Sequence, residues 1–228
     1  MKYWRLYNSA EKEVGFVPQI VEPVFEGYYT DSNQLWNIHF QRIEANTIIP
    51  KGHLHKKAKL TDIMSVSFLN GQLFFSDKML SILEASHYKC IQFVKTEIIT
   101  KTGERIKSNI LHPFEADYNF IDTLDSEFWY TNSMLDKLLE QVRFNTGNDY
   151  LNAKINNRKE IAKNETMDYK PLIIRKINFN DDMEIDLFSV SGVLFGGIGF
   201  YVSQRLKDKI LEEKCTGFIF REINEAYP

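Results

Sequence analysis

Two histidines separated by a single residue, His53 and His55, are the side chains whose spacing best suits metal binding. Alternate residues of a β-strand point to the same face, so both imidazoles would reach one ion, with His39 or His112 as a third ligand. The run from Lys51 to Lys59 opposes this interpretation, because its lysines repel a cation. We therefore interpret this segment as a solvated basic loop and expect no metal site and no cofactor. A metal-dependent enzyme that uses His53 and His55 is the alternative function.

An acidic run of Asp181, Asp182 and Glu184 is the candidate for contact with a basic partner. Complementary charge across an interface speeds association and sets specificity. The alternative is a turn with solvated carboxylates, and Asp186 favours it because this residue repeats Asp62 within a similar stretch. We expect a turn here, and retain Asp181, Asp182 and Glu184 as the candidate partner-binding residues.

The serines, cysteines and glycines that could suggest catalysis have simpler interpretations. Ser76 and Ser203 precede amphipathic segments and lie in no Gly-x-Ser-x-Gly turn, so we expect helix N-caps rather than nucleophiles. Cys90 and Cys215 form no Cys-x-x-Cys pair, so we expect free, buried thiols. The Gly-Gly-Ile-Gly segment at 196–199 lacks the spacing of a dinucleotide-binding loop and predicts a β-turn or bulge. We expect no catalytic residues.

The composition is that of a globular protein, with 43% hydrophobic and 26% charged residues in a chain of 228. The formal charge of −3 gives no basic footprint for nucleic acid, and the lysines around His53 lack interleaved aromatic residues. The first residues have no apolar core typical of a signal peptide, and no stretch reaches the length of a membrane span. We therefore expect a cytoplasmic protein with neither nucleic acid nor membrane as a partner.

The elements that position these residues are predicted to be mostly strands, with a few amphipathic helices. Strands are predicted over 3–7, 35–40, 63–69, 73–75, 90–99, 110–111, 128–130, 171–179, 183–190, 200–202 and 217–223. Helices are predicted after Ser76, over 133–144 and after Ser203, with turns at 50–52 and at Asn70-Gly71. The polar residues 145–170 predict a flexible or partly helical connection.

The chain also contains an internal repeat. Asp62 to Ser67 matches Asp186 to Ser191, Phe74 to Met79 matches Tyr201 to Leu206, and Cys90 matches Cys215 at an offset that stays constant through the closing strand. Duplication explains this match, and convergence of two ordinary strand–helix–strand units is the alternative. Each unit has one helix and few strands, which is too little to form a core alone.

We therefore expect an α+β fold in which two related strand–helix–strand halves pack together into one body with mixed or antiparallel sheets. The first half spans 1–144 and contains the first repeat at 60–99. Residues 145–170 connect it to the second half, which spans 171–228.

Two C-terminal segments, Gly199 to Lys207 and Cys215 to Phe220, resemble the closing signature of an immunity-protein family of bacterial polymorphic toxin systems, once described as a domain of unknown function. Asp122 to Phe128 is similar to the mid-chain segment of that family. Gln204 departs from the pattern, which has an acidic residue after the serine. The resemblance implies a cognate toxin protein as partner, neutralised by stoichiometric binding, and it implies no catalytic residues.

Overall fold

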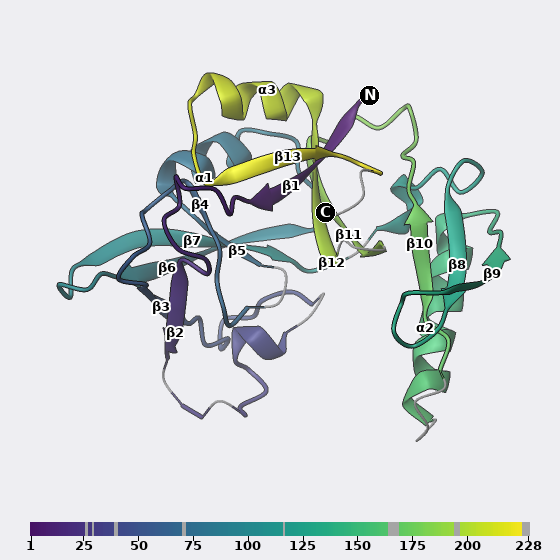
Figure 1. The fold of residues 1–228 in the computed structure, drawn as a ribbon, viewed down its shortest axis with the longest axis horizontal. Coiled ribbons are helices and arrows are strands. Elements are labelled where there is room, and N and C mark those ends of the chain that lie inside the picture. Colours follow the sequence, from purple (N-terminus) through teal and green to yellow (C-terminus); the bar gives the residue numbers. More distant parts are fainter. Residues whose placement is uncertain are drawn as a thin grey trace.

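The computed structural model describes residues 1–25, 27–28, 30–38, 41–69, 72–115, 117–163, 169–193 and 197–224 (Figure 1). These residues form two mixed sheets and three α-helices, which confirms the predicted α+β fold. The predicted turn at Asn70-Gly71, the candidate ligand His39 and the first glycine of the 196–199 segment lie outside the described residues.

The larger sheet has seven strands, drawn from both halves of the chain. They are β1 (Tyr3–Asn8), β8 (Glu127–Thr131), β9 (Leu138–Val142), β10 (Leu172–Lys176), β11 (Leu187–Val193), β12 (Gly197–Ser203) and β13 (Phe218–Glu222). Their order across the sheet is β13-β1-β12-β11-β10-β8-β9, so β9 and β13 are its two edges. All neighbours are antiparallel except β10 and β11.

The smaller sheet has six strands, all from the first half of the chain. They are β2 (Ile20–Val24), β3 (Lys51–Leu54), β4 (Ile63–Met64), β5 (Leu73–Phe75), β6 (Ile91–Ile99) and β7 (Arg105–Pro113), in the order β2-β3-β6-β7-β5-β4. The turn predicted at 50–52 is wrong, because Gly52 lies inside β3. A Cβ atom there would meet Cγ2 of Ile20 at 2.1 Å, so glycine allows close packing within a strand.

The three helices are α1 (Asp77–Glu84), α2 (Gly147–Lys163) and α3 (Gln204–Glu212). The predicted caps are confirmed, since Ser76 accepts the Met79 amide and Ser203 accepts the Leu206 amide at 3.2 and 3.1 Å. Two short 3-10 helices, η1 (Leu35–Asn37) and η2 (Tyr118–Phe120), complete the set among the described residues.

The internal repeat corresponds to two sheet units of the same architecture. In the first unit β4, β5, α1 and β6 follow in sequence, and β7 lies between β5 and β6 as their antiparallel neighbour. In the second unit β11, β12, α3 and β13 follow in sequence, and the middle strand is β1. The middle strand of the first unit, β7, therefore follows that unit in the chain. The middle strand of the second unit, β1, comes from the start of the chain.

The strand registers correct the sequence alignment of the two units. Taking Ser76 as the equivalent of Ser203, the pairing with β7 and β1 aligns Ile91 with Phe218. Cys90 then corresponds to Gly217, and both have positive φ values of 60° and 84°. The sequence match of Cys90 with Cys215 is thus two residues out of register. Both cysteines are free and buried as predicted, and burial raises the pKa of each thiol to about 11.

Reciprocal hydrogen bonds join the two units. Asp62 accepts the Ser76 hydroxyl at 2.7 Å in its own unit and the Thr216 amide of the other unit at 2.9 Å. Asp186 accepts the Ser203 hydroxyl at 2.5 Å in its own unit and an amide of the first unit, from His87, at 3.1 Å. Each carboxylate therefore orients its own capping serine and holds the loop that follows the opposite helix.

One hydrophobic core lies between the units. It is built from buried side chains of both: Leu6, Ile63, Phe75, Met79, Leu83, Ile91, Leu111, Leu187, Phe200, Val202, Leu206, Ile210 and Cys215. Helices α1 and α3 pack over this core on the same side of the molecule (Figure 1). Neither helix can bury its apolar side without the other unit.

Several predicted elements differ in the structure. The strand predicted over 35–40 is wrong where described, because Leu35 and Trp36 are consecutive buried residues of η1 rather than alternating strand positions. The strand predicted over 63–69 is shorter, since β4 ends at Met64, and the strand predicted over 183–190 is displaced, since β11 begins at Leu187 and ends at Val193. The helix predicted over 133–144 is wrong, because this segment completes the hairpin of β8 and β9.

The polar connection predicted over 145–170 contains α2. This helix buries Tyr150 and Lys154 and packs against η2, where Gly147 lies directly on the Tyr118 backbone. The helical part of that prediction is therefore confirmed, and strands from both sides of the connection pair in the larger sheet.

Candidate functional site

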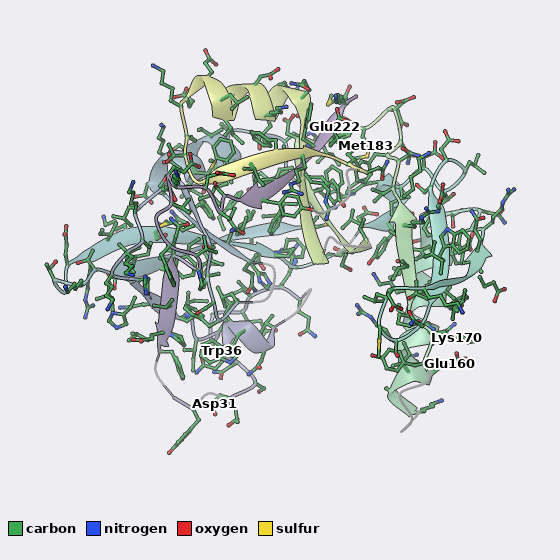
Figure 2. The ribbon with its side chains drawn as sticks, viewed as in Figure 1. Asp31, Trp36, Glu160, Lys170, Met183 and Glu222 are labelled. Carbon is green, nitrogen blue, oxygen red and sulfur yellow. The ribbon has the colours of Figure 1, made fainter. Side chains whose placement is uncertain are left out.

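An acidic groove of about 640 Å³ lies where the first residues of the chain meet the end of β13 and two loops that flank it. Four carboxylates line it, and they come from segments far apart in the sequence: Asp122, Asp125, Asp181 and Glu222. Glu222 marks this region at the top of the molecule in Figure 2. We call it the acidic groove.

Backbone bonds between the two loops fix the positions of these carboxylates. The Asp122 amide donates to the Asn178 carbonyl at 2.9 Å, and Ile121 and Phe179 form an antiparallel bridge. The Asp122 carboxylate accepts the amides of Leu124 and Asp125 at 2.9 and 3.2 Å, which holds the 122–125 loop in a tight turn. The walls of the groove are therefore held in place by contacts within the chain, both between the two loops and inside the 122–125 turn.

The floor of the acidic groove is tied to β1. The Tyr3 hydroxyl donates to the carbonyls of Met183 and Ile185, both at 3.1 Å, beneath the loop that carries Asp181. Burial, with Asp186 nearby, raises the pKa of Tyr3 to about 12, so the hydroxyl keeps its proton and remains a donor at neutral pH. The loop is thus held against the strand.

Negative charge exceeds positive charge in the acidic groove. Lys2 pairs with Glu222 at 2.9 Å, and the hydrogen bond lowers the pKa of that carboxyl group. The N-terminal amine lies 3.9 Å from Asp181. Asp122 and Asp125 form no ion pair with any described residue. Between them, Leu124 is 86% exposed, so an apolar side chain projects from an acidic rim.

The structure separates the residues of the predicted acidic run by role. Asp181 lines the acidic groove, while Asp182 is exposed and does not line it. Glu184 is exposed, and its backbone carbonyl accepts a hydrogen bond from the His87 ring at 3.0 Å. Asp186 is buried in the bonds that join the two units, which agrees with the structural role inferred from the repeat.

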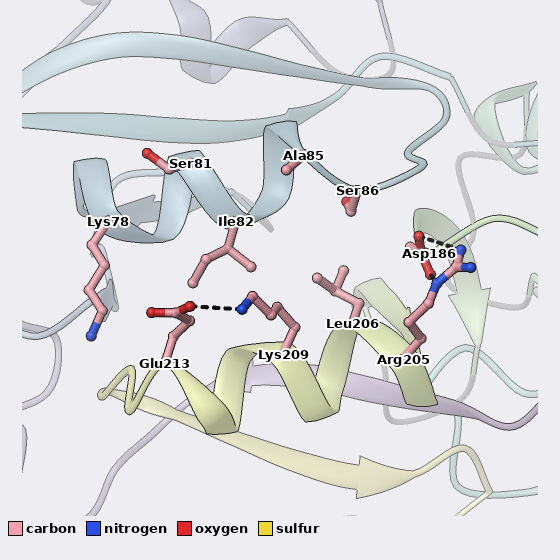
Figure 3. Close-up of a pocket in the computed structure, with 10 residues that line it drawn as sticks. All are labelled: Lys78, Ser81, Ile82, Ala85, Ser86, Asp186, Arg205, Leu206, Lys209 and Glu213. Atoms are coloured by element: carbon pink, nitrogen blue, oxygen red, sulfur yellow. Dashed lines mark hydrogen bonds and ion pairs between the residues drawn. The ribbon is translucent and has the colours of Figure 1, made fainter.

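A second groove, of about 560 Å³, lies between α1 and α3 (Figure 3). Ile82, Ala85 and Leu206 give it an apolar lining. Four of the charged side chains at its rim are already paired with each other: Arg205 with Asp186 at 2.8 Å, and Lys209 with Glu213 at 2.9 Å. This groove therefore offers apolar surface and few free charges.

The predicted metal candidates are not assembled into a larger ligand set. His53 lies in β3, whereas the His55 ring stacks on Phe16 at 3.7 Å and accepts the Lys57 amide. His112 is buried in β7 and bonds to Gln72 and to the Gln41 carbonyl, both at 2.8 Å. Among the residues that the structure describes, no three His, Cys, Asp or Glu side chains are grouped so that they could hold a metal ion.

Sequence reasoning missed a buried lysine. The Lys154 ammonium group contacts the Tyr118 hydroxyl at 2.7 Å and the Ser191 carbonyl and hydroxyl at 2.9 and 3.1 Å. Burial, with a smaller effect of Arg158, lowers the pKa of Lys154 to about 7. Gly192, at φ +83°, makes room for it, since an added Cβ atom would lie 2.3 Å from Nζ.

A serine hydroxyl beside a lysine of lowered pKa is an arrangement that acyl-transfer enzymes use. Here all three side chains are at least nine-tenths buried, and none of them lines either groove described above. We therefore assign the cluster to anchoring α2 on the larger sheet. The sequence signal that could have revealed it is the spacing of Tyr150 and Lys154, one helical turn apart on the same face.

Comparisons with known proteins add no relative: no protein-family model matches the chain, and a search of curated proteins finds no match. None of the helices in the described part of the chain has the length and apolar character needed to cross a bilayer.

Proposed function

We propose that this protein is a non-enzymatic immunity protein that binds a cognate bacterial toxin and neutralises it by occupying a basic surface of that toxin. The observation that carries the proposal is the acidic groove, whose carboxylates include Asp122 and Asp125 on either side of the exposed Leu124 in the chain. Interfaces combine an apolar anchor with a polar rim in this way, and complementary charge speeds the encounter.

The resemblance in the C-terminal segments supports the same function. The segments that carry it form β12, the start of α3 and β13, and the end of β13 places Glu222 on the acidic groove. The mid-chain segment that carries the rest of the resemblance contains Asp122, Leu124 and Asp125. The mid-chain segment therefore contributes Asp122 and Asp125 to the acidic groove, and Glu222 lies two residues beyond the C-terminal segments.

The rigidity of the site fits stoichiometric binding. The loops are ordered by backbone bonds and by the Tyr3 hydroxyl, so little conformational freedom is lost when a partner docks. An inhibitor of this kind needs no reaction centre. It needs only a shaped, charged surface that reaches the toxin before the toxin reaches its target.

Co-expression with the cognate toxin tests this function. Cells that express both proteins should grow, and the two proteins should elute together at a one-to-one ratio. Replacing Asp125→Lys and Asp181→Lys together should weaken binding at least tenfold, because two attractive contacts become repulsive.

Two exposed acidic residues outside the groove provide matched controls. Asp182→Lys changes the same charge beside Asp181, and Glu104→Lys changes it on the distant hairpin of β6 and β7. Both variants should bind as the unmodified protein does. Failure of the unmodified protein to bind the toxin or to rescue cells contradicts the proposed function.

A further inference from the structure

Arg5 carries a buried charge whose side-chain donors are unpaired. It lies in β1, between β12 and the edge strand β13 of the larger sheet (Figure 1), and only 3% of the residue is exposed. Its Nε and Nη2 atoms are buried and form no hydrogen bond, and no carboxylate in the described part of the chain forms an ion pair with it. Because arginine is almost never fully buried unless it is paired, these two nitrogens indicate a binding role.

Another arginine of this chain binds a carboxylate with the same two nitrogens. Arg205 donates from Nε and Nη2 to the two oxygens of Asp186, at 3.1 and 2.8 Å. This side-on fork matches the spacing of the oxygens in a carboxylate or phosphate group. The fork of Arg5 has the same chemistry, so the group that fits it best is an oxyanion.

Aromatic rings flank the Arg5 guanidinium group but do not satisfy its fork. The Arg5 Cζ atom lies 4.9 Å from the centre of the Tyr7 ring and 6.0 Å from the centre of the Tyr201 ring. A ring face attracts a cation, yet it presents no lone pair to the Nε–H and Nη2–H groups. The rings therefore reduce the cost of burying the charge and leave both donors available to a ligand.

A further unpaired donor lies on the same face of the sheet. Tyr201 stands directly opposite Arg5 in β12, so both side chains project from one face. The Tyr201 side chain is fully buried, and its hydroxyl has no hydrogen-bond partner. Burial raises the pKa of Tyr201, so the hydroxyl keeps its proton and can donate.

Positive charge accumulates at this face. Arg221 stands opposite Arg5 in β13, and its Cζ atom lies 5.9 Å from the Tyr7 ring that Arg5 also contacts. Like charges directly opposite each other in a sheet are destabilising, and an anion beside Arg5 offsets that repulsion. Tyr7 and Arg221 are half-buried, so the cluster reaches the surface at these two side chains.

The burial of Arg5 decides which kind of ligand can bind. A side chain of a folded partner cannot reach a group that is 3% exposed without opening the sheet. A small free anion can enter between the side chains of β1 and the edge strand β13. The fork therefore fits a small molecule rather than a docked protein.

We propose that Arg5 is the centre of an internal binding site in which its fork binds the carboxylate or phosphate group of a small molecule and the Tyr201 hydroxyl donates to the same group. Arg5 does not line the acidic groove, and this site does not depend on the proposed function. Binding neutralises the buried charge and so stabilises β1 between β12 and β13, where it completes the sheet of the second unit.

Urea unfolding with two probe anions tests this site. In chloride buffer of matched ionic strength, added phosphate or acetate should raise the unfolding midpoint of the unmodified protein. An anion at one hundred times its Kd should lower the unfolding constant about a hundredfold. The larger response shows whether the site prefers a phosphate or a carboxylate group.

Three variants separate the fork from charge alone. Arg5→Met should abolish the response to either anion, and Arg5→Lys, which keeps the charge but lacks the fork, should weaken binding at least tenfold. Arg105→Met is the matched control, because it removes the same charge from an exposed arginine of β7. This control should keep the full response.

Stability in chloride buffer alone gives a second readout. Arg5→Met and Tyr201→Phe should unfold at a midpoint equal to or above that of the unmodified protein, because each removes a buried polar group that lacks a partner. A purely structural role for Arg5 predicts a lower midpoint in Arg5→Met.

Two results overturn the site. One is a response to phosphate and acetate in Arg5→Met equal to that of the unmodified protein, which would assign the effect to an adventitious ion only. The other is the absence of any response in the unmodified protein, which would mean that water and the aromatic rings satisfy Arg5.

Discussion

At the scale of single residues, burial decides the chemistry of the ionisable groups. Lys154 and Asp186 are both buried, at 6% and 4% exposure, yet their partners differ. Burial penalises the charge of Lys154, and no described carboxylate pairs with it to offset that cost, so its uncharged form is favoured. Asp186 is bonded by Arg205, Ser203 and the His87 amide, so its charged form is favoured.

The free energy of unfolding should depend on Lys154 between about pH 7 and pH 10. The folded pKa is about 7 and the ordinary value is 10.5, so in this window the unfolded chain binds the extra proton. Stability therefore rises with pH, by up to about 1.4 kcal/mol per unit. Lys154→Met should remove this dependence in urea unfolding series, while Lys159→Met on the exposed side of α2 should keep it. A pH slope in Lys154→Met equal to that of the unmodified protein contradicts the assignment.

Asp186 should give a dependence of the same sign, with stability rising with pH, but in the acid range. Burial alone would raise its pKa, but the hydrogen bonds from Arg205, Ser203 and His87 outweigh burial and lower it. Its contribution is complete above the ordinary carboxyl pKa and is lost as pH falls through the folded value. Asp186→Asn should cost about 2–3 kcal/mol at pH 7 in urea unfolding, because a buried charged hydrogen-bond network is broken. Asp62→Asn, at the equivalent but less buried position, should cost about 1 kcal/mol; equal losses would contradict the role of burial.

At the scale of elements, local signals and long-range pairing contribute differently. Ser76 and Ser203 could be assigned from sequence, because a cap depends on the few residues that follow it. The strand in the 133–144 segment could not be assigned from the sequence, because the apolar residues there have helical spacing: Leu135, Leu138, Leu139 and Val142. Pairing with β8 and the Asn132 turn override that spacing, and both depend on contacts that periodicity does not encode. The acidic groove was found only in part for the same reason: Asp181 was a candidate, but the loop that brings Asp122 and Asp125 to it is distant in sequence.

The backbone strain in the β8–β9 tip predicts that two substitutions of Leu135 will differ in their effect on stability. Leu135→Gly relieves the left-handed backbone, whereas Leu135→Ala removes the same exposed side chain and keeps the strain. The glycine variant should therefore be more stable than the alanine variant by about 1 kcal/mol in urea unfolding. An alanine variant as stable as the glycine variant would show that the tip is unstrained.

At the scale of the whole molecule, the second unit is incomplete without the first residues of the chain. Its middle strand is β1, so the sheet of the C-terminal half closes only when a strand from the opposite end of the sequence inserts between β12 and β13. The repeat was visible in sequence because each unit keeps its own serine and aspartate. The role of β1 was not visible in the sequence, because Tyr3 to Asn8 lies far along the chain from the second repeat, and no equivalent strand stands next to that repeat.

This shared construction predicts that the two units unfold together. Met79 is fully buried in α1, within the core to which both units contribute. Met79→Ala should cost about 2–5 kcal/mol, as expected for truncating a buried side chain. Because Asp62 and Asp186 each bond to the opposite unit, the loss should propagate across the interface. Hydrogen exchange should therefore quicken by a similar factor in β6 of the first unit and β13 of the second. Acceleration confined to β6 would mean that the units are stable separately and that the reciprocal carboxylates contribute little to their coupling.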